Sequence, residues 1–141
     1  MGSPRDLLEG IGNAITGDAA QLEKICTADV EFEDSVQSAK GIPAVTEYLR
    51  SWSTAFPDAT TSIGRVVAGD DQAVGEMLYR GTQTGPMATA QGAIPATGRS
   101  VELKGAAWIT IRDGKIARFN GYYDTMTMMV QLGLMPAPAT A

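Results

Sequence analysis

The chain has 141 residues, of which 44% are hydrophobic and 19% are charged, and its formal net charge at pH 7 is −5. This composition provides enough apolar material for the core of one domain and excludes a disordered chain. The 11 basic residues are scattered and the apolar runs are short, so we expect no binding to nucleic acid or to a membrane, and no bilayer span of roughly 20 apolar residues.

The first part of the chain predicts three helices and one strand. Residues 5–16 place apolar side chains at helical spacing, and residues 18–28 predict a second, shorter helix that Asp18 caps. Residues 30–34, VEFED, alternate apolar and acidic side chains, which is typical of a half-buried strand. Residues 42–56 have a proline in the first turn and then apolar residues at helical steps, so they predict the third helix.

The rest of the chain predicts two β-hairpins followed by a helix. The hairpin turns are the Gly-Asp-Asp sequence at 69–71 and the Asp-Gly pair at 113–114. The four strands that they join are 58–69, 72–85, 101–112 and 115–124. Between the hairpins, residues 87–100 are rich in Gly, Pro, Ala and Thr and predict a loop. A C-terminal helix is expected over 125–132, followed by a flexible tail over 135–141.

Helices that precede a long antiparallel meander predict an α+β fold. The sheet needs its apolar face covered, and the early helices are the elements that can cover it. If the sheet curls around them, the space between sheet and helices becomes a cone-shaped pocket. We interpret residues 1–141 as one domain, with residues 1–4 disordered or left over from an expression tag.

Histidine is absent from the sequence, and Cys26 is its single cysteine. The absence of histidine excludes Ser-His and Cys-His catalysis and removes the usual ligand of transition metals, so proton transfer has to come from Asp, Glu, Tyr, Lys or Arg. The sequence has no metal-ligand cluster and no glycine-rich phosphate loop, and we expect no metal and no cofactor. The lone cysteine and the lack of a secretory signal predict a cytoplasmic location, with Cys26 as a small core residue.

Five short segments carry a family pattern, and they are FPD (56–58), GTQTGP (81–86), IPATGRSVEL (94–103), RDGKI (112–116) and YYDTMTMMVQLGL (122–134). In this order they resemble the SnoaL-like polyketide cyclase or ester cyclase family, which has the nuclear transport factor 2-like fold. The last segment is the most specific. The resemblance implies a strongly curved antiparallel sheet that N-terminal helices wrap into a cone-shaped apolar cavity, a hydrophobic small-molecule substrate and a homodimer.

Characterised members of this family close a ring by an aldol condensation, with an acid at the end of the last strand as general acid/base. Asp124 occupies that place in this sequence. Relatives with the same fold include limonene epoxide hydrolase, ketosteroid isomerase and pyran-forming cyclases, so the fold alone leaves the reaction open. Family members often have a histidine where this chain has Gln83, which can donate a hydrogen bond to a substrate carbonyl group but cannot take up a proton.

Asp124 has two interpretations, an N-cap of the following helix or a general acid/base. Thr125 can also cap that helix, which leaves Asp124 free. A carboxylate held among tyrosine and methionine side chains would have its pKa raised toward the range that suits proton abstraction near neutral pH. Because side chains two residues apart in a strand share a face, Asn120 and Tyr122 would then line the cavity too, unless Asn120 faces solvent.

Two further acids have both a structural and a functional interpretation. Asp34 ends the 30–34 strand, where it is either an exposed acid or a cavity residue that forms an acid-base pair with Asp124. Glu76 lies within an apolar strand, where a charge is either functional or paired with an arginine of a neighbouring strand.

Aromatic and methionine side chains are expected in the core or on the cavity wall, where methionine adapts to irregular shapes. On this basis the residues assigned to substrate binding, besides those named above, are Tyr48, Trp52, Met77, Tyr79 and Trp108. The 87–98 loop would lie over the cavity as a lid.

Three functions are compatible with these features. The first is a cofactor-independent cyclase of polyketide-like molecules, in which Asp124 removes a proton next to a carbonyl group and an intramolecular aldol attack closes the ring. The second is an epoxide hydrolase or isomerase of the same fold, and an epoxide hydrolase needs an arginine beside an aspartate inside the pocket. The third is a non-catalytic domain that binds a small molecule or dimerises with a partner.

Overall fold

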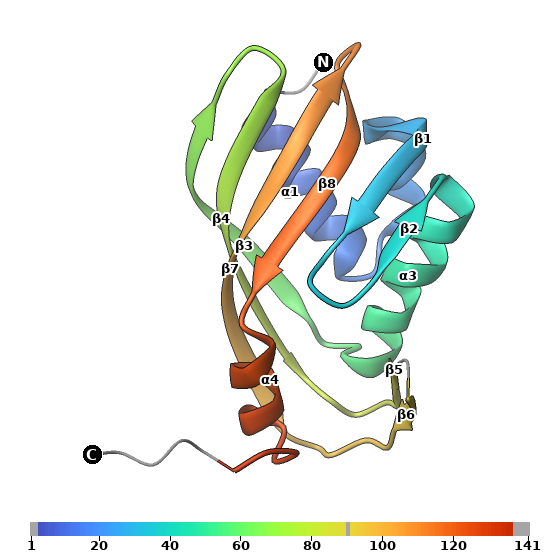
Figure 1. The fold of residues 1–141 in the computed structure, drawn as a ribbon, viewed down its shortest axis with the longest axis vertical. Coiled ribbons are helices and arrows are strands. Elements are labelled where there is room, and N and C mark those ends of the chain that lie inside the picture. Colours follow the sequence, from blue (N-terminus) through green and yellow to red (C-terminus); the bar gives the residue numbers. More distant parts are fainter. Residues whose placement is uncertain (1–2, 90, 137–141) are drawn as a thin grey trace.

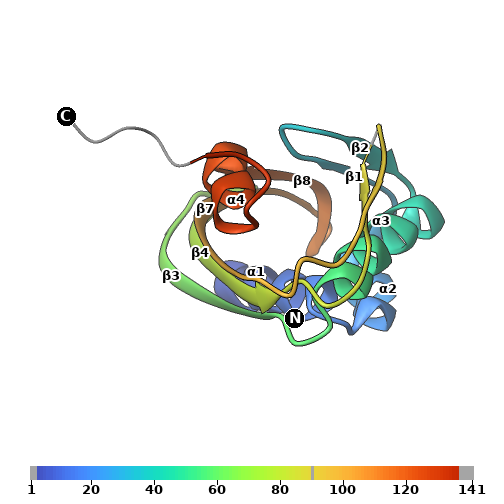
Figure 2. The ribbon, with the colours of Figure 1, turned by 90° about the horizontal axis from the view of Figure 1, so that it is seen from below.

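A curved sheet of six strands wraps around helices in the computed structural model, which describes residues 3–89 and 91–136 (Figures 1 and 2). Its elements in chain order are α1 (Pro4–Ile15), η1 (Ala19–Gln21), α2 (Leu22–Ile25), β1 (Cys26–Glu33), β2 (Ser38–Lys40), α3 (Ile42–Ala55), β3 (Thr60–Ala68), β4 (Gln72–Thr82), β5 (Met87–Thr89), β6 (Gly92–Ile94), β7 (Ser100–Arg112), β8 (Lys115–Tyr123) and α4 (Thr125–Gln131). The strand order is β2-β1-β8-β7-β4-β3, with β5 and β6 as a separate hairpin. Figure 2 shows α1, α2 and α3 on the inner side of the curve, which is the predicted α+β arrangement.

Helix α1 begins with a capping box. The Ser3 hydroxyl accepts a hydrogen bond from the Asp6 amide, the Asp6 carboxylate accepts one from the Ser3 amide, and Pro4 takes the first helical position. The apolar face of α1 then packs closely on the sheet, because a Cβ atom at Gly75 of β4 would lie 2.8 Å from Leu8 Cδ1. Glycine at this position therefore lets helix and sheet approach each other.

The structure changes two expectations about the N-terminal half. The helix expected over 18–28 is limited to η1 and the four-residue α2, because β1 already begins at Cys26, and Asp18 makes no capping hydrogen bond through its side chain. The disorder expected over residues 1–4 does not extend to Ser3 and Pro4, which begin α1. Residues 1–2 and, in the expected C-terminal tail, residues 137–141 lie outside the described residues.

Strand β1 runs parallel to β8, with Phe32 beside Phe119 and Glu33 beside Asn120. The other strand pairs of the described six-stranded sheet are antiparallel. In a parallel pair the carboxyl ends of both strands meet at the same edge of the sheet. The residues that follow β1 and the last residues of β8 therefore lie close together, which brings Asp34 next to Gly121.

Two clusters of buried side chains form the core. The first lies between α1, α3 and the middle of the sheet and includes Leu8, Ile11, Phe32, Leu49 and Ile109. The second lies toward α4 and includes Phe56, Tyr79, Val101, Leu103 and Leu132. Cys26 belongs to the first cluster, as predicted, and burial raises the pKa of its thiol to about 12.

The segment predicted as a loop over residues 87–100 contains the short β5–β6 hairpin, and β7 begins at its last residue. The Asp-Gly turn of the β7–β8 hairpin is as predicted. Asp113 and Gly114 have positive φ angles of 54° and 76°, which a two-residue turn of this kind requires.

Candidate active site

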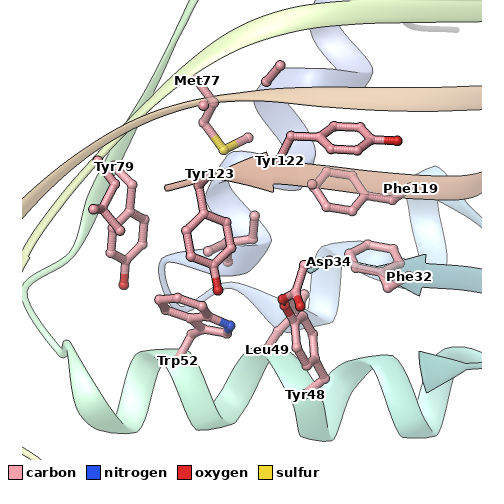
Figure 3. Close-up of a pocket in the computed structure, with 15 residues that line it drawn as sticks. Phe32, Asp34, Tyr48, Leu49, Trp52, Met77, Tyr79, Phe119, Tyr122 and Tyr123 are labelled. Carbon is pink, nitrogen blue, oxygen red and sulfur yellow. The ribbon is translucent and has the colours of Figure 1, made fainter. Parts of the chain in front are cut away.

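A pocket of about 80 Å³, called the inner pocket below, lies between the concave face of the sheet and α3 (Figure 3). Its lining residues are Ile15, Phe32, Asp34, Tyr48, Leu49, Trp52, Met77, Tyr79, Leu103, Gly105, Ala106, Phe119, Gly121, Tyr122 and Tyr123. Aromatic and aliphatic side chains dominate this lining, and Asp34 is its ionisable acid. Five residues predicted to contact a substrate are in the lining, namely Tyr48, Trp52, Met77, Tyr79 and, at its border, Tyr122.

Ring packing holds the pocket wall in place. The centroid of the Trp52 ring lies 5.5 Å from that of Tyr79 and 5.8 Å from that of Tyr123, in both cases edge to face. Phe32 and Phe119 stack at 4.7 Å across the β1–β8 pair. Such ring pairs add to the stability that burial alone provides, so the pocket is preformed by the core that surrounds it.

Asp34 follows β1 directly and is half-buried. Its Oδ1 atom accepts hydrogen bonds from the amides of Val36 at 2.7 Å and Gln37 at 2.9 Å, and its Oδ2 atom accepts one from the Tyr48 hydroxyl. The turn that these amides form fixes the direction of the carboxylate. Among the described residues, no ion pair involves Asp34.

Three tyrosines of the lining are held in their protonated form. Burial raises the pKa of Tyr48, Tyr79 and Tyr123 above the ordinary tyrosine value, and the Asp34 carboxylate adds to this effect at Tyr48 and Tyr123. Near neutral pH these hydroxyls remain hydrogen-bond donors. Donors of this kind stabilise negative charge that develops on a substrate oxygen.

Asp124 lies outside the inner pocket, so its predicted place in the cavity needs correction. It is the N-cap of α4, where its Oδ1 atom accepts a hydrogen bond from the Thr127 amide at 3.1 Å and its Oδ2 atom accepts one from the Thr127 hydroxyl at 2.6 Å. The side chain is exposed, and these two hydrogen bonds lower its pKa instead of raising it. Asp124 is therefore the N-cap of α4, and Asp34 is the acid at the pocket.

The face of β8 that we assigned to the cavity is its outer face. Phe119 is 6% exposed and stacks on Phe32, which directs it inward. Alternation along the strand then directs Gly121 and Tyr123 inward as well. The sequence prediction aligned the strand on Asp124, whereas the burial of Phe119 decides which face is inside.

Three predicted contact residues are consequently on the outer face of the sheet. Asn120 accepts a hydrogen bond from the guanidinium of Arg118 at 3.1 Å, and Trp108 donates one to the side chain of Gln72 at 3.1 Å. Tyr122 borders the pocket, but Figure 3 shows its ring on the opposite side of β8 from the inward residues. Its side chain is 55% exposed, so it does not enclose a ligand.

Gln83 is fully buried, and its side chain binds backbone instead of facing a substrate. Its Nε2 atom donates to the carbonyl oxygens of Gly85 at 3.3 Å, Ile94 at 3.4 Å and Pro95 at 3.2 Å. Its Oε1 atom accepts from the Thr97 hydroxyl at 2.8 Å and from the Thr97 amide at 3.3 Å. The predicted role in substrate binding is corrected to a structural one, in which Gln83 holds both ends of the β5–β6 segment.

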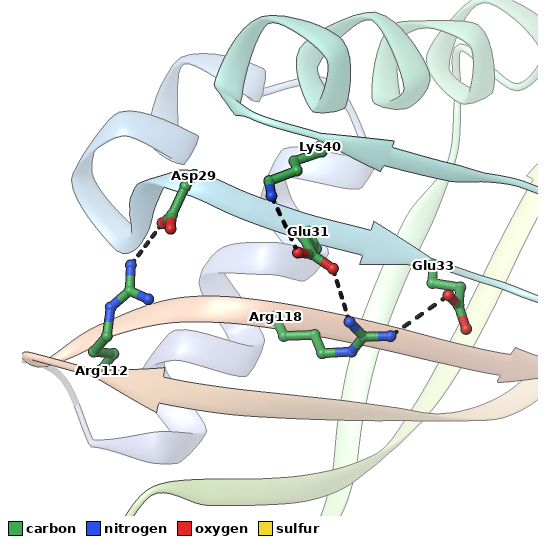
Figure 4. Close-up of polar contacts among 6 residues, drawn as sticks. All are labelled: Asp29, Glu31, Glu33, Lys40, Arg112 and Arg118. Carbon is green, nitrogen blue, oxygen red and sulfur yellow. Dashed lines mark hydrogen bonds and ion pairs between the residues drawn. The ribbon is translucent and has the colours of Figure 1, made fainter.

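The arginines of the sheet pair with acids on its surface. The pairs are Arg65–Glu76, Arg80–Glu102, Arg112–Asp29 and Arg118 with Glu31 and Glu33, of which Figure 4 shows the last two sets. These side chains are between 42% and 89% exposed. Glu76 is thus paired with an arginine, and none of these arginines lines the inner pocket. The arrangement of arginine beside aspartate that epoxide opening needs is missing from the described lining.

A larger hollow of about 740 Å³, called the outer pocket below, adjoins the inner one. The two share Tyr48, Trp52 and Tyr123. The outer pocket is bounded by α3, the β5–β6 hairpin and α4, and it includes Met87, Met128 and Met129. A ligand too long for the inner pocket can therefore extend into the outer one.

Several pocket residues were missed in the sequence, among them Phe32, Phe119, Gly121 and Tyr123. A usable signal existed, because Phe119 lies between Arg118 and Asn120, and an apolar residue between polar ones in a strand indicates an inward face, which Gly121 and Tyr123 share. Gly121 leaves space in the pocket, since a Cβ atom there would lie 3.1 Å from Phe119 Cε1 and 3.9 Å from Asp34 Cβ.

Within residues 3–89 and 91–136, no group of three or more Cys, Asp or Glu side chains is arranged to hold a metal ion. None of the helices described in these ranges has the length and apolar character needed to cross a membrane.

Comparisons with known proteins match this architecture. TsrD from Streptomyces laurentii is 26% identical to this chain with a TM-score of 0.79, and the match covers 92% of this chain and 94% of TsrD. IdmH, a candidate polyketide cyclase from Streptomyces antibioticus, is 23% identical with a TM-score of 0.74 over 94% of this chain and 99% of IdmH. A protein of ketosteroid isomerase-like fold from Catenulispora acidiphila DSM 44928, bound to trimethylamine, is 16% identical with a TM-score of 0.76. The match covers 92% of this chain and 94% of that protein.

A comparison with curated proteins finds no match. The solved structures share a fold that occurs both in candidate polyketide cyclases and in proteins of the ketosteroid isomerase-like type. A family model described as the SnoaL-like domain matches residues 6–119, which is most of the sequence. The curved sheet, the inner pocket and this match lead to one conclusion, that the chain belongs to the SnoaL-like domain family.

Proposed function

We propose that the chain is a cofactor-independent enzyme that transfers a proton at a carbon next to a carbonyl group of a hydrophobic, polyketide-like molecule. Asp34 is the general acid/base in this proposal. The observation that carries it is a carboxylate without an ion-pair partner in an otherwise apolar, aromatic pocket. An acid at the wall of an apolar pocket is placed where it can exchange a proton with a carbon atom of a ligand bound there.

The reaction starts with the transfer of the α-proton to the Asp34 carboxylate. The electron pair of the broken C–H bond moves into the carbonyl group and forms an enolate. A protonated tyrosine hydroxyl of the lining donates a hydrogen bond to the enolate oxygen and lowers the energy of this intermediate. The Tyr48 hydroxyl already donates to Asp34 and keeps that carboxylate oriented.

Two outcomes follow from the same enolate. In a cyclase, the enolate carbon attacks a second carbonyl carbon of the same molecule, a C–C bond closes the ring, and the proton held by Asp34 returns to the new alkoxide. In an isomerase, Asp34 returns the proton to a different carbon. The outer pocket favours the cyclase, because a long chain that folds back on itself needs volume beyond the inner pocket.

Exchange of α-protons for deuterium in heavy water tests this chemistry without the natural substrate. With α-tetralone as the probe, we expect the protein to accelerate exchange at the carbon next to the carbonyl group by about 100-fold or more over buffer, as general acid/base catalysis typically does. Gly121→Val should reduce exchange to near the buffer rate, because its side chain fills the space beside Asp34. Proton NMR measures the rates.

Thermal unfolding of Gly121→Val provides the control, since a fold that stays intact assigns the lost exchange to a blocked pocket. Exchange at the buffer rate with the unaltered protein would contradict the proposal. Binding of the probe without exchange would instead favour the non-catalytic binding domain.

We also propose that two copies pair through the outer face of the sheet. Large apolar side chains are exposed there, with Val67 at 76%, Tyr122 at 55% and Trp108 at 42%. Pairing would remove this apolar surface from water. A molar mass of twice the 14.8 kDa of the chain in light scattering is expected, and the monomer mass at micromolar concentration would argue against pairing.

A further inference from the structure

The hydroxyl group of Tyr79 is buried without a hydrogen-bond partner. Tyr79 lies on β4 and is 7% exposed, and its hydroxyl meets no donor or acceptor among the described residues. Buried hydroxyl groups nearly always have a hydrogen-bond partner, because an unpaired one loses its hydrogen bonds to water and this free-energy cost is not compensated. The partner of this group is therefore expected to come from outside the chain.

The packing of the ring sets the direction of this hydroxyl. The Tyr79 ring meets Phe56 edge to face at a centroid distance of 5.8 Å and Trp52 edge to face at 5.5 Å. Figure 3 shows the oxygen of Tyr79 pointing across the inner pocket toward α3, in the same direction as that of Tyr123. The packing of the ring therefore fixes the direction of the hydroxyl, and a ligand oxygen reaches it from the side of the pocket.

We propose that the Tyr79 hydroxyl is the donor to a carbonyl oxygen of a neutral ketone bound in the inner pocket. The inference deepens the function proposed above and rests on it for the identity of the site. It assigns to the ligand an uncharged, mainly apolar body and an oxygen acceptor at the end of the pocket where Tyr79 lies. Tyr79 is a binding and oxyanion-stabilising residue in this assignment, whereas Asp34 handles the proton.

The charges around the pocket decide between ligand classes. The described lining has no lysine or arginine and includes the acid Asp34, so a carboxylate or phosphate ligand would find no countercharge there. An organic cation would suit the aromatic rings and Asp34, but it has no acceptor for the Tyr79 hydroxyl. Burial raises the pKa of Tyr79, so the group stays a donor near neutral pH. A neutral carbonyl compound needs no countercharge, has an apolar body that suits the lining, and offers an acceptor to the Tyr79 hydroxyl.

Tyr79→Phe tests the assignment, because it removes the oxygen and keeps the ring. In calorimetric titrations, the affinity for α-tetralone should fall about 2- to 10-fold, the range expected for one neutral hydrogen bond. The affinity for tetralin, the matched hydrocarbon without the oxygen, should stay the same or rise. The midpoint of thermal unfolding should stay the same or rise as well, since the hydroxyl has no partner in the protein to lose.

Three results would overturn the inference. They are an equal change for ketone and hydrocarbon, a lower unfolding midpoint in Tyr79→Phe, and no binding of α-tetralone by the unaltered protein. Tighter binding of tetramethylammonium than of α-tetralone would show a cation site instead. If Tyr79→Phe behaves as expected while Asp34→Asn still exchanges α-protons, this inference stands and the proposed catalytic role of Asp34 is wrong. If Asp34→Asn loses exchange while Tyr79→Phe binds α-tetralone as the unaltered protein does, the catalytic role stands and this inference is wrong.

Discussion

Asp34→Asn is expected to slow the exchange of the α-protons of α-tetralone by about 10²- to 10⁴-fold, the range that a positioned general acid/base contributes. The amide oxygen of the variant can still accept the hydrogen bonds from Val36 and Gln37, so the turn and the fold should persist. An amide cannot take up the proton of a C–H bond near neutral pH. Proton NMR in heavy water gives the rates, and calorimetric binding of the probe should change much less than the rate.

Asp124→Asn is the matched control for this substitution. It makes the same chemical change in the acid that the family pattern places at the end of the last strand. Asparagine caps helices about as well as aspartate does, so α4 should remain intact. Because the Asp124 side chain is exposed and bonded to Thr127, we expect exchange at the unaltered rate. A loss of exchange confined to Asp124→Asn would reverse the assignment, and no loss in either variant would remove both acids from the mechanism.

Gln83→Met is expected to destabilise the fold by about 3 kcal/mol, because it removes the hydrogen bonds of a fully buried side chain to three carbonyl groups and to Thr97, each worth about 0.5–1.5 kcal/mol. Methionine has nearly the volume of glutamine, so the loss reports hydrogen bonds and not a cavity. The carbonyl groups concerned belong to Gly85, Ile94 and Pro95. For a chain of this size the unfolding midpoint should fall by about 10 °C in calorimetry.

Gln91→Met is the control, because Gln91 lies on the same segment with an exposed side chain. Its unfolding midpoint should change little, as is usual for exposed sites without special contacts. An unchanged midpoint in Gln83→Met would contradict the structural role. Loss of ketone binding with full stability would return Gln83 to the substrate-binding role that its place in the family pattern suggested.

The elements of this chain were largely predictable. Helices α1 and α3 and both long hairpins follow from helical spacing, strand alternation and the Asp-Gly turn, because these signals depend on neighbours close in the sequence. The second helix was overestimated, since the strand that begins at Cys26 takes up residues with helical spacing. The pairing of β1 with β8 determines where the helix ends, and helix propensity, which depends on nearby residues, cannot predict this pairing.

The site was predictable only in part. The sequence indicated an acid, several aromatic side chains and an apolar cavity, and it placed Tyr48, Trp52, Met77 and Tyr79 correctly on the cavity wall. It aligned β8 by Asp124, which reversed the face of the strand. A strand has two equivalent faces, and a shift of one residue exchanges them. The face is decided by the contact of Phe119 with another strand.

The sequence by itself determined the α+β fold class and the apolar, histidine-free character of the pocket, because these properties follow from the order of elements and from composition. The strong curvature of the sheet was an implication of the family resemblance. The tertiary structure alone decided which acid faces that pocket. The parallel pairing of β1 with β8 brings Asp34 beside Gly121, whereas the start of α4 binds Asp124 through Thr127. Both effects depend on contacts between distant segments, and no pattern within one segment contains them.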